Sequence, residues 1–102
     1  NDLQTLAKDT RTLYGAEAKY LVAQQLYKAG EYTAAEKEIL NFIDQSTPHA
    51  YWLARSFVLL SDVYVAMDKK LDARQYLLSL QQNYHADDDI EQMINERLEK
   101  LK

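Results

Sequence analysis

Two stretches of the sequence are similar: Ala16–Ile43, AEAKYLVAQQLYKAGEYTAAEKEILNFI, and Phe57–Leu80, FVLLSDVYVAMDKKLDARQYLLSL. Each has the apolar spacing of an amphipathic helix, then a tight turn, then a second helix. They align at a constant offset of 38 residues, which pairs Ala23 with Ser61, Leu26 with Tyr64, Gly30 with Asp68 and Ala35 with Ala73. A repeated helix-turn-helix unit is typical of proteins that stack such units into one continuous core. We therefore predict an all-α fold suited to binding.

The first copy contains a pattern of small, aromatic and apolar residues: Ala16, Ala18, Ala23, Tyr27, Gly30, Tyr32, Ala35, Ile39 and Phe42. The charged residues Glu17 and Lys28 lie within the same pattern. This pattern resembles a tetratricopeptide repeat, whose consensus places small residues where helices cross closely. The second copy keeps most of the pattern, but has Asp68 where the family prefers glycine and Lys70 where it prefers an aromatic residue. The resemblance implies a right-handed superhelical array of about six antiparallel helices.

The period is longer than the roughly 34 residues of the family. Thr47 and Pro48 have the spacing of an N-cap followed by proline at the first helical position, which predicts a lengthened helix from Pro48 to about Met67. Lengthened, tyrosine-rich repeats resemble a bacterial envelope subfamily, as in outer-membrane assembly lipoproteins and the cell-division coordinator of the Tol-Pal system. This resemblance implies a periplasmic or cell-envelope location, which composition alone does not reveal.

Four segments are expected within residues 1–102. Residues 1–14 form a leftover helix of a preceding repeat, which Gly15 ends, residues 16–46 and 47–84 form the two repeats, and residues 87–102 form a capping helix. Asp88 and Glu91 have the spacing of a capping box at the start of that last helix. We expect the chain to be a fragment of a longer array.

Composition excludes several classes of function. The net charge is −4, and no run of basic residues offers a footprint for nucleic acid. No stretch approaches the roughly 20 apolar residues that a membrane-spanning helix needs, and there is no cysteine for disulfides or thiolate metal sites. His49 and His85 are far apart in sequence, and the acidic run at residues 87–89 is explained by helix capping. We therefore expect no enzyme, no cofactor and no metal site.

In the tetratricopeptide family, ligands bind on the concave surface made by the first helix of each repeat. Carried over by position, the resemblance implies a groove with the following polar and aromatic residues: Glu17, Tyr20, Gln24, Tyr27, Lys28, Arg55 and Asp62. Trp52 is a possible secondary contact. A groove that binds a ligand predicts exposed Tyr20, Gln24 and Tyr27 side chains. The alternatives are that Tyr20 and Tyr27 pack on the neighbouring helix, and that Trp52 covers the core.

The sequence therefore favours a non-enzymatic module that binds a peptide or partner protein through its concave face. The carboxylate clamp of chaperone adaptors is not favoured, because only Arg55 is basic among its expected positions Tyr20, Gln24, Arg55 and Leu59. The alternative function is a structural end cap or a self-association segment with no groove ligand.

Overall fold

The computed structural model describes residues 13–44 and 49–101. Within these ranges the chain forms helices and no strand, so the predicted all-α class is confirmed. The helices are α2 (Leu13–Lys28), α3 (Tyr32–Asp44), α4 (Ala50–Ala66), α5 (Lys70–Asn83) and α6 (Ile90–Lys100). None of these described helices is long and apolar enough to cross a membrane.

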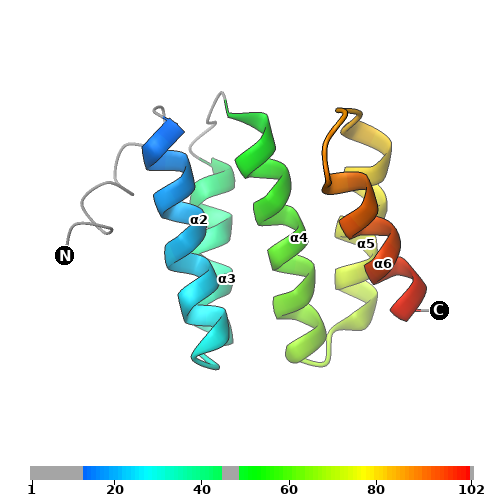
Figure 1. The fold of residues 1–102 in the computed structure, drawn as a ribbon. Helices are drawn as coiled ribbons and strands as arrows, with labels where there is room; N and C mark the ends of the chain where they lie inside the picture. Colours follow the sequence, from blue (N-terminus) through cyan, green and yellow to red (C-terminus); the bar gives the residue numbers. More distant parts are fainter. Residues whose placement is uncertain (1–12, 45–48, 102) are drawn as a thin grey trace.

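The helices lie in two layers (Figure 1). One layer contains α2, α4 and α6, and the other contains α3 and α5. Within the first layer the backbone of α4 lies close to those of both α2 and α6, whereas among the described residues no Cα atoms of α3 and α5 lie within 8 Å of each other. The layer of α2, α4 and α6 is therefore the more closely joined of the two.

The turns that end α2 and α4 have the same pattern of hydrogen bonds. Gly30 and Asp68 both adopt the left-handed backbone conformation, with φ of 81° and 61°. In the first turn the amide of Glu31 donates to the carbonyl of Leu26 at 2.9 Å, and in the second Lys69 donates to Tyr64 at 2.7 Å. Gly30 donates to Tyr27 and Asp68 to Val65, which completes a Schellman motif in each copy. The predicted offset of 38 residues is confirmed at both turns.

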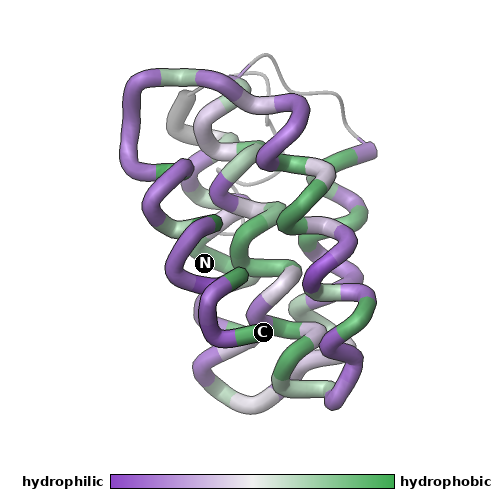
Figure 2. Tube along the Cα trace, turned by 90° about the vertical axis from the view of Figure 1, so that its right-hand side faces the viewer, coloured by the Kyte–Doolittle hydropathy of each residue, from purple (hydrophilic) through white to green (hydrophobic). Residues whose placement is uncertain are grey.

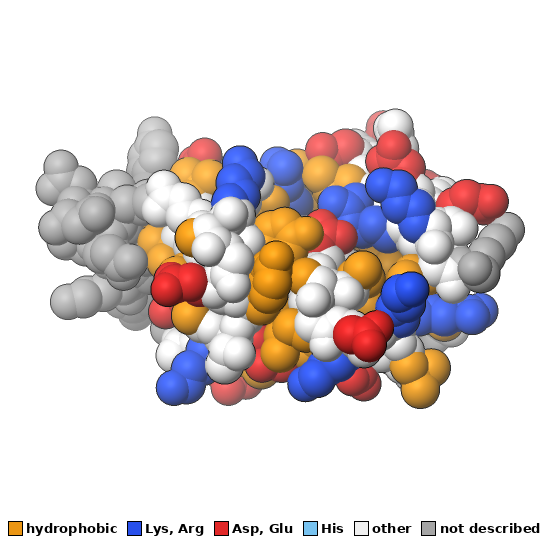
Figure 3. Space-filling model, turned by 90° about the horizontal axis from the view of Figure 1, so that it is seen from below, with side chains coloured by type: hydrophobic (Ala, Val, Ile, Leu, Met, Phe, Trp, Pro, Cys, Tyr) orange, Lys and Arg blue, Asp and Glu red, His pale blue; other side chains and the backbone are white. Residues whose placement is uncertain are grey.

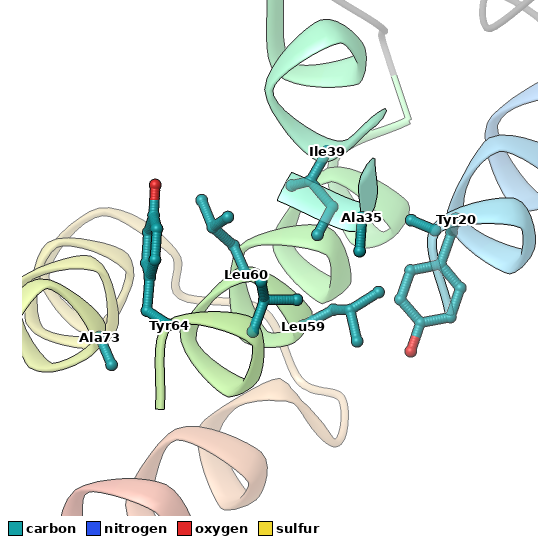
Figure 4. Packing of buried hydrophobic residues seen from close by; sticks show 9 residues of the cluster. Tyr20, Ala35, Ile39, Leu59, Leu60, Tyr64 and Ala73 are labelled. Atoms are coloured by element: carbon teal, nitrogen blue, oxygen red, sulfur yellow. The ribbon is translucent and has the colours of Figure 1, made fainter. Parts of the chain in front are cut away.

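Small residues allow the helices of the core to approach closely. The predicted crossing residues Ala23, Ala35, Ser61 and Ala73 are all at most 2% exposed. Around them α4 supplies Leu59 and Leu60, which lie among side chains of the other repeat helices (Figure 4). The hydroxyl of Ser61 donates to the carbonyl of Val58 at 2.8 Å, so the polar group of this small residue is satisfied within its own helix.

Helix α6 covers the far end of the core. Ile90 and Ile94 are at most 2% exposed and pack with Ala54 and Val58 of α4 and with Leu77 of α5. Figure 2 views this end of the bundle and shows hydrophobic positions interrupting a mainly hydrophilic helix. The helix is amphipathic, since the following residues of its other face are exposed: Glu91, Gln92, Asn95, Glu96, Glu99 and Lys100.

The prediction that Gly15 ends a preceding helix is wrong. Gly15 lies inside α2, which begins at Leu13. One glycine in a helix costs only about 1 kcal/mol relative to alanine, and the buried Ala16 and Ala18 next to it stabilise the continued helix. The leftover helix itself was predicted for residues that otherwise lie outside the described part of the chain.

Two predicted helix starts also differ from the structure. Helix α4 begins at Ala50 with His49 as N-cap, and the predicted cap at Thr47 and Pro48 lies outside the described residues. Helix α6 begins after Asp89 as N-cap, one residue later than predicted. The carboxylate of Asp88 instead accepts from the amide of Ile90 at 2.9 Å. Because Asp88 also accepts from the hydroxyl of Tyr84, it is held toward α5.

Candidate functional site

A hollow lies in the layer of α2, α4 and α6, and we call it the central hollow. Its volume is about 150 Å³. It is lined by Tyr20, Gln24, Tyr27 and Lys28 of α2, by Arg55, Val58, Leu59 and Asp62 of α4, and by Met93 and Arg97 of α6. The structure thus brings together every predicted groove residue except Glu17, which is half-buried on α2 outside the lining.

The expected exposure of the groove tyrosines is wrong for Tyr20. Its side chain is only 6% exposed, because its ring packs against Trp52 of α4 with the ring centroids 5.6 Å apart. The alternative that Tyr20 packs on the neighbouring helix is therefore confirmed. Gln24 and Tyr27 are half-buried and remain accessible in part.

Arg55 is held among aromatic rings. Its guanidinium carbon lies 5.1 Å from the ring centroid of Tyr20, 6.0 Å from that of Tyr51 and 5.8 Å from that of Trp52. These distances suit cation–π attraction. Nη1 donates to the hydroxyl of Tyr51 at 3.4 Å, and the buried Nε has no hydrogen-bond partner within the described ranges. The contacts of Trp52 with Tyr20 and Arg55 make it part of the wall that supports the groove.

The loop before α6 is fixed to α4 and α5 by two tyrosines. Tyr51 donates to the carboxylate of Asp89 at 2.9 Å, and Tyr84 donates to Asp88 at 2.5 Å. Burial, together with the hydrogen bond to Asp88, raises the pKa of Tyr84 to about 12. In the part of the chain that the structure describes, no group of three or more His, Cys, Asp or Glu side chains is arranged to hold a metal ion.

Asp62 does not present a free charge to the groove. It accepts two hydrogen bonds from Arg97 of α6, from Nε at 2.9 Å and from Nη2 at 3.0 Å. Burial raises the pKa of Tyr27 at the edge of this ion pair, and the negative charge of Asp62 raises it further. The pair joins α4 to α6 and lines the central hollow.

A second and larger hollow adjoins the central one at the end of the helices where the turns lie, and we call it the lower hollow. Its volume is about 650 Å³. It shares Tyr27, Asp62 and Arg97 with the central hollow, so the two hollows are adjacent, and we call them together the groove. The residues that line only the lower hollow are Ser61, Val65, Ala66, Lys70, Glu96, Lys100 and Leu101.

Lys70, Arg97 and Lys100 line the groove but were not predicted from the sequence. The sequence pointed to Lys70, because the second copy has a lysine at this position where the first copy has the aromatic residue Tyr32. Arg97 and Lys100 had no such signal, since their place depends on how α6 lies across α4.

Comparisons of the chain with protein-family models, with curated proteins and with solved structures find no significant match. The functional interpretation therefore depends on the groove itself: an aliphatic floor, aromatic and amide side chains on one wall, and several cations.

Proposed function

We propose that this chain is a tetratricopeptide-like interaction module that binds a peptide segment of a partner protein in the groove between α2, α4 and α6. The proposal rests mainly on one observation, which is that six predicted groove residues from two helices line a single hollow. The repeated turn and the small residues at the helix crossings support the repeat architecture.

The groove has the chemistry of a peptide site. Val58 and Leu59 give an apolar floor, while Gln24 and the hydroxyl of Tyr27 can hydrogen-bond a peptide backbone. Large aromatic side chains add contact area at a small cost in conformational entropy. Among the lining residues that the structure describes, the hydroxyl of Ser61 is already bound to a carbonyl of its own helix, which does not suit a nucleophile. These features support binding in preference to catalysis.

The proposal is tested by affinity capture from fractionated lysate with three versions of the chain as bait. The groove variant carries Gln24→Ala and Lys28→Ala. The control variant carries Lys37→Ala of α3 and Gln75→Ala of α5, both exposed and outside the groove lining. Each variant removes one lysine and one glutamine, so the loss of charge and of side-chain length is matched.

We expect a partner that the natural chain and the control variant retain and the groove variant loses, with all three equally helical by circular dichroism. The fraction that yields the partner also tests the envelope location, which stays a prediction. Equal recovery by all three baits would contradict groove binding. A mass that rises with concentration, without any partner, would favour the self-association alternative.

A further inference from the structure

The groove is basic although the chain as a whole is acidic. Five basic side chains line its two hollows, from both copies and from α6, against the carboxylates of Asp62 and Glu96. This is an excess of three positive charges in a chain whose net charge is −4. A groove with charge of one sign and an apolar floor concentrates ligands of the opposite sign. Its field therefore favours an anionic ligand.

Three of these cations are available to a ligand. Lys28, Lys70 and Lys100 are exposed, and within the described ranges none has a carboxylate at ion-pair distance. Arg97, in contrast, is engaged by Asp62. The three lysines come from the end of α2, the start of α5 and the end of α6. Lys28 lines the central hollow, whereas Lys70 and Lys100 line the lower one.

Helix stability does not explain Lys70. It is the first residue of α5, where the positive end of the helix dipole disfavours a cation. The preceding residue, Lys69, is basic as well, whereas the corresponding position of the first copy carries Glu31.

The two copies differ at a pair of residues that line the lower hollow in the second copy. In the first copy Tyr27 and Tyr32 pack together with their ring centroids 5.8 Å apart. At an offset of 38 residues, the second copy has Val65 and Lys70, which line the hollow. Seen from this end of the bundle, apolar side chains gather near the middle of the surface, and basic and acidic side chains lie around them (Figure 3).

We infer that the groove binds a partner segment that combines apolar residues with Asp or Glu side chains, and that these carboxylates contact Lys28, Lys70 and Lys100. The inference rests on the proposed function and specifies the chemistry of the partner. The apolar residues of the segment lie beside Val65 and Leu101 in the lower hollow. Its acidic residues lie against the three lysines.

The test is a selection from a phage-displayed library of random 12-residue peptides, with the 102-residue chain as bait. Parallel baits carry Lys70→Gln with Lys100→Gln, or Lys37→Gln with Arg74→Gln. Lys37 and Arg74 are exposed on α3 and α5 outside the groove, so both variants lose the same two charges. Displayed peptides joined to the coat protein at their C-terminus have no free carboxylate there, so any acidic preference reports side chains.

We expect peptides enriched at least twofold in Asp and Glu over the unselected library. Their synthetic versions should bind the natural chain and the Lys37→Gln, Arg74→Gln control alike, and the Lys70→Gln, Lys100→Gln variant at least fivefold more weakly. Peptides that are enriched without acidic residues would overturn this inference and leave groove binding intact. Equal weakening in both variants would overturn it as well. Failure of the natural chain to enrich any peptide over bare support would overturn the proposed function itself.

Discussion

Two substitutions at the left-handed turn positions, Gly30→Ala and Asp68→Gly, should change the free energy of unfolding in opposite directions. Gly30 and Asp68 have φ of 81° and 61° in turns with the same hydrogen bonds. No atom lies within 4 Å of the place that a Cβ at Gly30 would occupy, so Gly30→Ala introduces no clash. Its cost is the left-handed conformation of an L-residue, roughly 1–2 kcal/mol, reduced by the roughly 0.5–1 kcal/mol that glycine loses in unfolded-chain entropy.

We therefore expect Gly30→Ala to lower the free energy of unfolding by about 1 kcal/mol and Asp68→Gly to raise it by up to about 1 kcal/mol. For a chain of this size, 1 kcal/mol corresponds to roughly 4–8 °C in Tm. Thermal unfolding followed by far-ultraviolet circular dichroism measures both changes. Asp68→Asn is the control, because Asn also tolerates the left-handed region, and its Tm should stay near that of the natural chain. A lower Tm for Asp68→Gly, or an unchanged one for Gly30→Ala, would refute the equivalence of the two turns.

Three further changes test the packing, the helix pairing and the loop before α6. Ala35→Leu overpacks a crossing where the alanine is 0% exposed, and should cost about 1–3 kcal/mol; an unchanged Tm would count against the close approach of the helices there. A double-mutant cycle of Asp62→Asn and Arg97→Met should give a coupling of about 1 kcal/mol by urea unfolding, since the two side chains are only 25% and 29% exposed; a coupling near zero would mean that the pair does not hold α6. Because the pKa of Tyr84 is raised above 10.0 to about 12, its protonated form stabilises the fold below pH 10, and this contribution is lost as pH rises toward 12. Tyr84→Phe should reduce the alkaline loss of unfolding free energy, and an identical pH profile would contradict the raised pKa of that hydroxyl.

Local features of the chain were predictable from its sequence. The Schellman turn depends on a few consecutive residues, so Gly30 indicated the first turn and the constant offset located the second at Asp68. The apolar face of α6 followed from its helical spacing, which is also a local property.

Features that depend on how helices lie against one another were not predictable. The pairing of Asp62 with Arg97 spans 35 positions and requires α6 to lie across α4. The burial of Tyr20 requires Trp52, on another helix, to cover its ring. Residues of the groove could be assigned to a face, but their exposure and their partners were set by neighbouring helices.

The position of Trp52 gives the protein an internal optical probe. It is the only tryptophan in the sequence, and its ring lies 5.6 Å from that of Tyr20 on α2 and 5.2 Å from that of Tyr51 on its own helix. Excitation absorbed by these tyrosines passes to Trp52 at such short range, and the transfer from Tyr20 is lost when α2 separates from α4. The part of the tyrosine-excited Trp52 emission that a Tyr20→Phe variant lacks therefore reports the contact between α2 and α4 without any added label.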